Sequence, residues 1–252
     1  MSVSTVLRER LDLFEVIEDD AKRALLAIAE DVAPVAKGER IRRTGGPATE
    51  FWCVAEGWFY SSSTLKDGGR QVYSFHLPGD VMGLPDLGWE IAVCDVTAAT
   101  KAAVIRMEKE AFRDVVRAHP TLGGFFLTFG IYDHTRLLDQ LRVIGRMPAI
   151  KRVAHLLLQL AAEQAEPQTM REAANDDGTT LHLPIDQSLM GDAVGLTNIS
   201  VSRMMSELEE MGFIQRSGKN IRVPKIEEMK AFCDYTERQR SVPLSWMLQP
   251  KG

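Results

Sequence analysis

The chain has 252 residues, which is enough for two domains and a substantial hydrophobic core. Its net charge of −5 excludes a generally basic protein, so any nucleic-acid binding must come from a local patch. There is no run of about 18 apolar residues to span a membrane, and residues 1–10 lack the apolar core of a secretion signal. The three cysteines are far apart and suggest neither a disulfide framework nor a metal-ligand pair, so we expect a cytoplasmic protein.

The N-terminal half of the chain changes from a helical to a strand-like pattern. Residues 1–31 carry apolar side chains at helical spacing, and Asp19 or Asp20 can cap the second segment. From Val32 to about Met107, short apolar or alternating runs are separated by glycines, which is typical of a β-sandwich or a small barrel. The predicted strands are Arg40–Arg43, Phe51–Val54, Trp58–Ser61, Gln71–Phe75, Val93–Val96 and Val104–Met107.

A helix at Lys109–His119 is followed by a long helix at Thr121–Ile144 with two apolar ridges. One ridge alternates steps of three and four, which indicates a coiled-coil seam against a second copy of the chain: Leu127, Gly130, His134, Leu137, Leu141 and Ile144. We interpret His134 as a polar residue that sets the register of this seam rather than as a ligand. The second ridge is expected to pack on the β-domain and contains Leu122, Phe125, Phe129 and Tyr132.

A break in the pattern at Gly145–Pro148 predicts a hinge before the C-terminal third of the chain. An amphipathic helix is expected at Ala149–Gln164, then a polar surface loop up to Gly178. A short strand at Leu181–Leu183 follows the loop, and a further helix is predicted at Lys225–Arg238.

Two short helices joined by a tight turn are predicted between residues 186 and 211. Asp186 can cap the first helix, Gly195 supplies a left-handed turn, and Thr197 can cap the second helix. The second helix has a polar outer face and core spacing at Val201, Met204, Met205 and Leu208. This pattern predicts a helix-turn-helix, whose second helix fits the DNA major groove, although a small three-helix core would give a similar pattern.

Two strand-like segments, Phe213–Arg216 and Asn220–Val223, follow the second helix at once. They flank a Ser-Gly-Lys turn, which predicts a basic hairpin and hence a winged helix. Three basic side chains of this hairpin are placed to contact backbone phosphates, or else are ordinary surface charges: Arg216, Lys219 and Arg222. Residues 184–225 carry five basic and five acidic side chains, so the pattern favours DNA whereas the composition does not.

Two motifs carry a resemblance to a known family. They are Glu56-Gly57, Asp67-Gly68-Gly69-Arg70 and the stretch from Phe75 to Gly83 in the barrel, and Gly195-Leu196-Thr197 with Val201-Ser202-Arg203 in the helix-turn-helix. Together they resemble the CRP/FNR superfamily of bacterial transcription regulators, and the stretch from Phe75 to Gly83 looks more like the FNR branch. The resemblance implies an α+β protein with a double-stranded β-helix (jelly-roll) sensor barrel, a long dimerisation helix and a C-terminal winged helix-turn-helix.

The domains expected from this resemblance follow the order of the predicted elements. They are N-terminal helices with a cyclic-nucleotide-binding-like barrel at 1–119, a dimerisation helix and hinge at 120–147, a DNA-binding domain at 148–225 and an unassigned extension at 226–252. The implied function is sequence-specific regulation of transcription by a homodimer on a pseudo-palindromic operator. The implied partners are double-stranded DNA, a second copy of the chain and RNA polymerase.

The departures from the family pattern concern the sensor. Cyclic-nucleotide binders of this family place a glutamate directly after the glycine that matches Gly83, and later an arginine-serine pair that holds the phosphate. Here Leu84 follows that glycine, and the later segment reads Ala92-Val93-Cys94-Asp95, so Asp95 would repel a phosphate. We therefore expect no control by cyclic AMP.

No cofactor is expected in the barrel. Iron–sulfur members carry an N-terminal cysteine cluster, which is missing before Cys53, and His76 is interpreted as structural rather than as a haem ligand. Four residues mark the region where relatives hold an effector: Trp52, Trp58, His76 and Trp89. We expect the aromatic rings to fill this pocket, so that the protein is active without an effector; an open pocket for an apolar effector is the alternative.

The resemblance also assigns the residues that read DNA. Ser202 and Arg203 match the base-reading pair, and Arg203 can contact guanine O6 and N7. Ile199 stands where the family has an acidic reader, so it can pack on a thymine methyl instead. The expected DNA-binding residues are Thr197, Asn198, Ile199, Ser200, Ser202, Arg203, Arg216, Lys219 and Arg222.

Two other classes of function remain as alternatives. A regulatory module that binds a small molecule and acts on protein partners would not need the winged helix. A β-barrel metalloenzyme would need several histidines and a carboxylate inside the barrel, and this region has one histidine, so we expect no enzyme.

Overall fold

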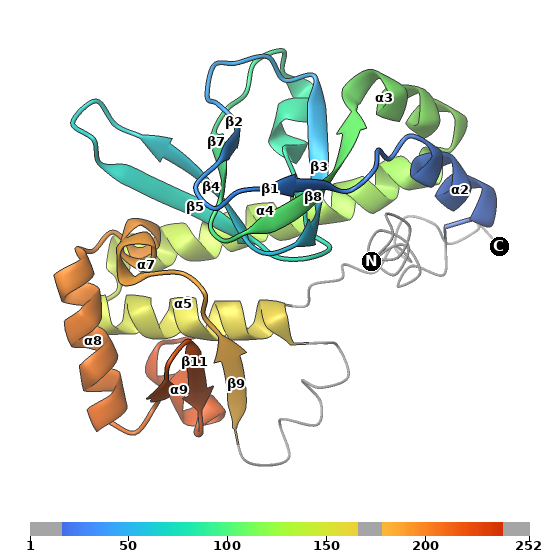
Figure 1. The fold of residues 1–252 in the computed structure, drawn as a ribbon. Helices are drawn as coiled ribbons and strands as arrows, with labels where there is room; N and C mark the ends of the chain where they lie inside the picture. The colour runs from blue at the N-terminus through green and yellow to red at the C-terminus, as the bar shows by residue number, and fades with distance from the viewer. Residues whose placement is uncertain (1–16, 166–177, 239–252) are drawn as a thin grey trace. The chain divides into compact units, whose positions relative to one another are not determined.

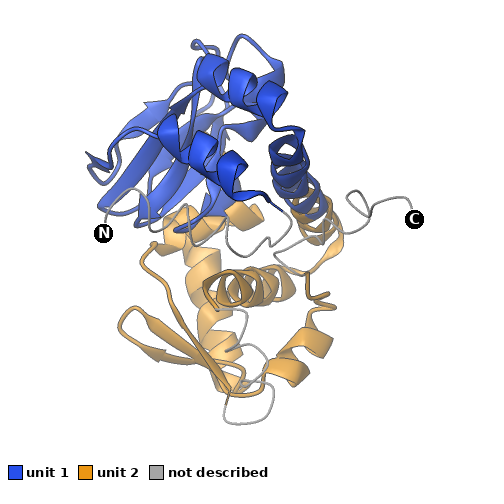
Figure 2. Cartoon of the chain, turned by 90° about the vertical axis from the view of Figure 1, so that its right-hand side faces the viewer, with its two compact units in different colours: residues 1–68, 73–135, 241–252 blue, residues 69–72, 136–240 orange. Residues whose placement is uncertain are grey.

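A computed structural model describes residues 17–165 and 178–238 of the chain (Figure 1). The helical pattern expected at 1–16, most of the predicted loop and the tail from residue 239 lie outside the described residues. The described residues form two compact units. One contains residues 17–68 and 73–135, and the other contains residues 69–72, 136–165 and 178–238 (Figure 2).

The barrel consists of two four-stranded sheets, with strand orders β1-β8-β3-β6 and β2-β7-β4-β5. All six predicted strands are confirmed, whereas β1 and β6, which are three and two residues long, were not predicted. The strands are β1 (Ala33–Val35), β2 (Arg40–Arg42), β3 (Glu50–Glu56), β4 (Phe59–Thr64), β5 (Arg70–His76), β6 (Val81–Met82), β7 (Asp95–Ala98) and β8 (Ala102–Glu108).

Strand β3 is buried on both faces, because its alternate side chains enter two different cores. Trp52 and Val54 join a cluster with residues from both sheets, such as Phe59, Met82 and Val96. Phe51 and Cys53 point to the other face, where helical side chains cover them. This explains why the β3 sequence is a nearly continuous apolar run and not an alternation of apolar and polar residues.

Three helices contribute to the second core: α2 (Asp19–Ala27), α3 (Lys109–Ala118) and α4 (Pro120–Arg146). The Phe51 ring makes edge-to-face contacts with Phe112 at 4.8 Å and with Phe126 at 5.9 Å between ring centroids. The expected packing of the second α4 ridge on the β-domain is confirmed for Leu122, Phe125 and Phe129. Glu18 precedes α2 without a capping side-chain bond, so neither Asp19 nor Asp20 is the cap; both lie in its first turn.

The other unit is a helical domain with a three-stranded sheet of order β10-β11-β9. Helix α5 forms its centre, since Val153, Leu157 and Leu160 are fully buried and the helix packs against α7, α8 and α9. Its elements are α5 (Ala149–Gln164), β9 (Thr179–His182), α7 (Gln187–Val194), α8 (Asn198–Glu210), β10 (Gln215–Ser217), β11 (Asn220–Val223) and α9 (Ile226–Phe232).

Two boundaries in this region differ from the sequence prediction. Helix α4 continues to Arg146, so the break is confined to Met147 and Pro148, where proline precedes the first turn of α5. Helix α9 ends at Phe232 and not at Arg238, and Asp234 has a φ of +51°. A left-handed backbone at this position is incompatible with a continuing α-helix, which periodicity alone does not reveal.

Candidate DNA-binding interface

The two helices of the predicted helix-turn-helix are confirmed, and each is capped as expected. Asp186 Oδ1 accepts a hydrogen bond from the Leu189 amide at 2.8 Å. Thr197 Oγ1 accepts one from the Ser200 amide at 3.2 Å. Gly195 ends α7 with a φ of +68°, which favours glycine. The local sequence therefore fixes both the ends of the helices and the turn between them.

Gly191 is a residue of this turn whose role was not predicted from the sequence. A Cβ atom on Gly191 would lie 2.4 Å from the carbonyl oxygen of Leu196. The Leu196 amide donates to the Gly191 carbonyl at 3.0 Å, so the turn folds directly back on α7. Glycine inside a helix is otherwise unfavourable, and this close approach explains why one stands here.

Helix α8 separates its buried and exposed residues as predicted. Val201, Met204, Met205 and Leu208 are buried. Ser202 and Arg203 are exposed, and Ile199 is 77 % exposed, an unusual environment for a large apolar side chain. Within the described part of the chain, the Arg203 side chain makes no hydrogen bond or ion pair. The guanidinium is thus available to an external partner.

The wing is a hairpin of β10 and β11, and β9 adds a third strand beside β11. Ser217 pairs with Asn220 across a two-residue turn, in which Gly218 has a φ of +61°. Lys219 stands at the tip of this turn. The β10 strand begins at Gln215, two residues later than predicted.

The three basic residues of the wing have different environments. Arg216 is engaged by Glu209 of α8, with 2.8 Å from Nε and 2.6 Å from Nη2 to Glu209 Oε2. Arg222 lies 3.5 Å from the Gln215 side-chain oxygen. The Lys219 side chain forms no hydrogen bond or ion pair with any residue that the structure describes. The structure therefore separates Lys219 from Arg216, which the sequence grouped together.

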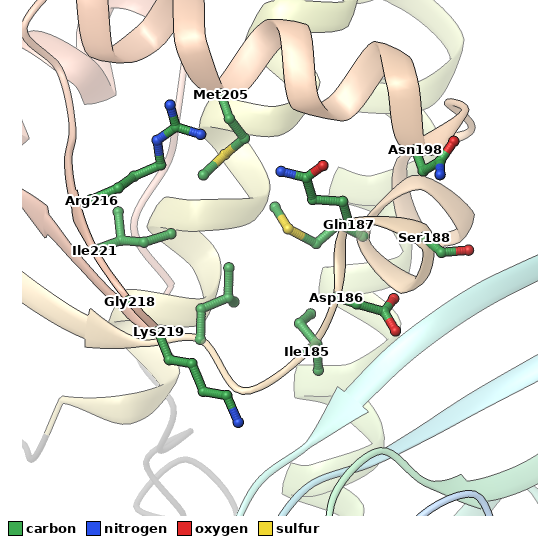
Figure 3. A pocket seen from close by; sticks show the side chains of 12 residues that line it. Ile185, Asp186, Gln187, Ser188, Asn198, Met205, Arg216, Gly218, Lys219 and Ile221 are labelled. Atoms are coloured by element: carbon green, nitrogen blue, oxygen red, sulfur yellow. The ribbon is translucent and has the colours of Figure 1, made fainter.

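A hollow of about 560 Å³ lies between the wing, the start of α7 and α8 (Figure 3). Met205, Ile221 and Gln187 point into it, and Arg216 and Lys219 stand at its edge. Gln187 and Ser188, in the first turn of α7, line the hollow as well and were not predicted as site residues. Their position in the first turn of a predicted helix could have indicated a site for DNA phosphates, because backbone amides at a helix N-terminus favour anions.

An exposed apolar stripe runs along α4. Leu127 is 48 %, Leu137 43 % and Leu141 71 % exposed, and His134 is exposed in the same stripe. Ile144, the last residue of the predicted seam, is partly buried. Leu138, which the sequence pattern did not include, is 54 % exposed and adds to the stripe. Contiguous exposed leucines on a long helix are typical of a helix–helix interface.

In the barrel, an ion pair joins Arg42 to Asp86, with 3.1 Å between Nη1 and Oδ2, and each side chain is 3 % exposed. The Arg42 guanidinium lies 4.5 Å from the centroid of the Trp52 ring and also donates to the Glu50 carbonyl. Asp86 lies in the 3₁₀ helix η1 (Leu84–Gly88), and its Oδ1 accepts from the Val93 amide at 2.9 Å. The sequence did not predict this pair, whose members are 44 residues apart.

The residues of the expected effector pocket lie in different environments. Trp52 is buried between the sheets, and Trp58 packs 6.3 Å from Phe75 between ring centroids. His76 is buried, with its Nε2 2.7 Å from Ser61 Oγ. Trp89 is 61 % exposed, so its ring does not fill the barrel interior. Among the described residues, no group of three or more His, Cys, Asp or Glu side chains is arranged to hold a metal ion.

Family models match both units. A Crp-like helix-turn-helix domain matches residues 151–232, and a cyclic nucleotide-binding domain matches residues 33–119. A winged helix-turn-helix that follows a barrel of this type in the chain defines the class of the protein as a DNA-binding transcription regulator. No helix among the described residues has the length and apolar character needed to cross a membrane.

Similar proteins narrow this class. The nitrogen fixation regulation protein FixK of Rhizobium meliloti is 28 % identical over 206 residues, which cover 81 % of this chain and 87 % of that protein. The transcriptional activator FnrL of Cereibacter sphaeroides is 28 % identical over 63 % of this chain and 62 % of its own length. The structure of FixK2 from Bradyrhizobium japonicum covers 81 % of this chain and 96 % of its own, with 25 % identity and a TM-score of 0.72. The chain thus carries a Crp-like helix-turn-helix domain and a cyclic nucleotide-binding domain, and it is similar to FNR-type regulators of the CRP/FNR superfamily.

Proposed function

We propose that the protein binds a pseudo-palindromic operator as a homodimer. The exposed apolar stripe on α4 carries this proposal, because Leu137 and Leu141 would otherwise remain in water at 43 % and 71 % exposure. A two-fold dimer places its two recognition helices about one helical turn of DNA apart. The partners in this proposal are DNA, a second copy of the chain and RNA polymerase in the cytoplasm, and no catalytic step is involved.

The outward face of α8 supports a specific mode of reading. The Arg203 guanidinium, which has no partner in the described chain, donates two hydrogen bonds to guanine O6 and N7. Ser202 contacts a neighbouring base or phosphate, and Ile199 packs on a thymine methyl. Thr197, Asn198 and Ser200, at the start of the helix, and the wing residues Lys219 and Arg222 contact the sugar-phosphate backbone.

Selection of genomic DNA fragments by the purified protein tests this proposal. We expect the enriched fragments to share a pseudo-palindrome with a guanine and a thymine in each half-site. Enrichment of single half-sites without symmetry would contradict the dimeric reading. Recovery of fragments without a common motif would contradict sequence-specific binding.

We also propose that no cyclic nucleotide controls this protein. Support comes from η1 and the segment after it, where related proteins hold the phosphate. Asp86 already binds the Val93 amide and the Arg42 guanidinium, so this cation is neutralised inside the barrel. Burial raises the pKa of the neighbouring Cys94 thiol, and the negative charges of Asp86 and Asp95 raise it further. Asp95 is likewise paired with Arg40, at 3.2 Å between Nη1 and Oδ2, so both arginines of this region are already engaged by carboxylates instead of being free to hold a phosphate.

Calorimetric titration with cyclic AMP and cyclic GMP tests the sensor proposal. We expect neither nucleotide to give a heat of binding. In a separate assay, we expect protein that is free of metal and chromophore to bind its operator at nanomolar concentration. Micromolar affinity for either nucleotide would contradict the proposal. Operator binding that requires cell extract or a small molecule would indicate an open pocket for another effector.

A further inference from the structure

Glu209 holds Arg216 more completely than an ordinary surface ion pair would. Its Oε2 atom accepts from Arg216 Nε at 2.8 Å and from Nη2 at 2.6 Å, and its Oε1 atom accepts from the Arg216 backbone amide at 3.1 Å. Ser206, one turn earlier in α8, lies 3.4 Å from the same Nη2. One carboxylate therefore fixes both the backbone and the side chain of Arg216.

This contact joins the last turn of the recognition helix to the first strand of the wing. Strand β10 is an edge strand of three residues, all of them exposed, so its own side chains bury little surface. The Ile214 side chain, just before the strand, is fully buried. Besides pairing with β11, the wing strand is thus attached through Ile214 and through the contact between Arg216 and Glu209.

The position of Glu209 gives no advantage to the helix itself. A carboxylate in the last turn of a helix interacts unfavourably with the helix dipole. The hydrogen bonds from Arg216 lower the pKa of the Glu209 carboxyl, because they stabilise its charged form. The contact with Arg216 of the wing therefore explains why a glutamate stands at position 209.

We propose that Glu209 is a positioning residue for DNA binding, which sets the wing against the recognition helix so that Lys219 meets the DNA backbone. The guanidinium of Arg216 is bound to Glu209 and does not contact a phosphate. Lys219, at the tip of the same hairpin, depends on this attachment for its position. This inference rests on the proposed DNA binding and identifies which wing cation acts on DNA.

Operator affinity measured over a range of salt concentrations separates the two cations. Each phosphate contact contributes about 0.9 to the slope of log K against log salt. We expect Lys219→Ala to reduce the slope by about this amount, and Arg216→Ala combined with Lys219→Ala to reduce it no further. A further reduction of about 0.9 in the double variant would overturn the proposal, because it would make Arg216 a phosphate contact of its own.

Glu209→Gln and Glu210→Gln form a matched pair of variants. Both remove one negative charge from the end of α8, but the Glu210 side chain makes no hydrogen bond or ion pair within the described residues. A purely electrostatic effect would strengthen DNA binding equally in both. We expect Glu209→Gln to bind the operator more weakly than Glu210→Gln, and Lys219→Ala to have a smaller effect when it is combined with Glu209→Gln.

Thermal unfolding of both glutamine variants serves as the control for folding. Tighter binding by Glu209→Gln, with a salt slope steeper by about 0.9, would overturn the proposal and show that Glu209 only masks Arg216. Additive effects of Glu209→Gln and Lys219→Ala would also overturn it. Failure of the proposed function is distinguishable, since the unsubstituted protein would then not bind an operator at all.

Discussion

The ring of Tyr235 packs against the imidazole of His155, with 5.0 Å between the ring centroids and 60° between their planes. This contact ties the segment after α9 to the central helix α5. Arg238 extends the attachment to α4, because its Nε donates to Asp139 Oδ2 at 2.9 Å and its Nη2 to Oδ1 at 3.2 Å. The first part of the C-terminal extension is therefore integrated into the helical unit.

Tyr235→Ala is expected to destabilise this unit. Loss of the aromatic contact and of the cover over His155 should lower the free energy of unfolding by about 1 kcal/mol. Urea denaturation measures the change, and Thr236→Ala is the control, because Thr236 is exposed. Equal stability of the two variants would mean that the Tyr235 contact adds nothing to the fold.

His155 should make stability depend on pH. Burial and the neighbouring Arg142 lower the pKa of His155 to about 4 from an ordinary value of 6.5. The unfolded chain therefore binds more protons than the folded chain between these pH values. The contribution of His155 to the free energy of unfolding is fully present above pH 6.5 and is lost as the pH falls toward 4.

We expect the pH dependence of His155 to amount to about 2 kcal/mol between pH 7.5 and pH 5. Urea midpoints of the unsubstituted protein and of His155→Gln, measured at both pH values, test this. In His155→Gln, most of the difference in stability between pH 7.5 and pH 5 should disappear. An unchanged pH dependence in His155→Gln would assign the effect to other groups.

Gly191→Ala should disrupt the turn of the helix-turn-helix, because the new methyl group would meet the Leu196 carbonyl oxygen at 2.4 Å. Overpacking against backbone costs about 1–3 kcal/mol. Gly145→Ala provides the comparison, since its added Cβ would meet nothing within 4 Å apart from its chain neighbours and the backbone of its own helix. Denaturation of both variants is expected to show a loss only for Gly191→Ala, and equal effects would exclude the steric explanation.

Leu141→Glu should prevent dimerisation. Leu141 is the most exposed leucine of the α4 stripe, and a charge there would be buried against its symmetry mate in the proposed dimer. Analytical ultracentrifugation should detect monomers. Operator binding should be lost as well, because a monomer contacts only one of the two half-sites. Leu65→Glu adds the same charge at a 65 % exposed leucine outside α4 and should remain dimeric. A dimeric Leu141→Glu variant would place the interface on another surface.

Local chemistry made the helix-turn-helix predictable from the sequence. Asp186, Gly195 and Thr197 each act within three or four residues of their own position, through a cap or a turn. The burial of Val201 and Leu208 follows from helical periodicity in the same way.

Contacts between distant segments were not predictable. Arg42 of β2 and Asp86 of η1 meet only in the folded barrel, and nothing in the sequence next to either residue marks it. The hold of Glu209 on Arg216 depends on how the wing turns back on α8. Because Glu209 belongs to another element, the sequence of the hairpin does not reveal that Arg216 has a carboxylate partner.

Operator affinity of Arg203→Ala is the most direct test of sequence-specific DNA binding by α8. Fluorescence anisotropy with the selected operator and with unrelated duplex DNA gives both affinities at one salt concentration. We expect Arg203→Ala to weaken operator binding by about 1–3 kcal/mol, to relax the preference at one guanine and to leave binding to unrelated DNA unchanged. Undiminished operator affinity with the same guanine preference would contradict the assignment of α8 as the recognition helix.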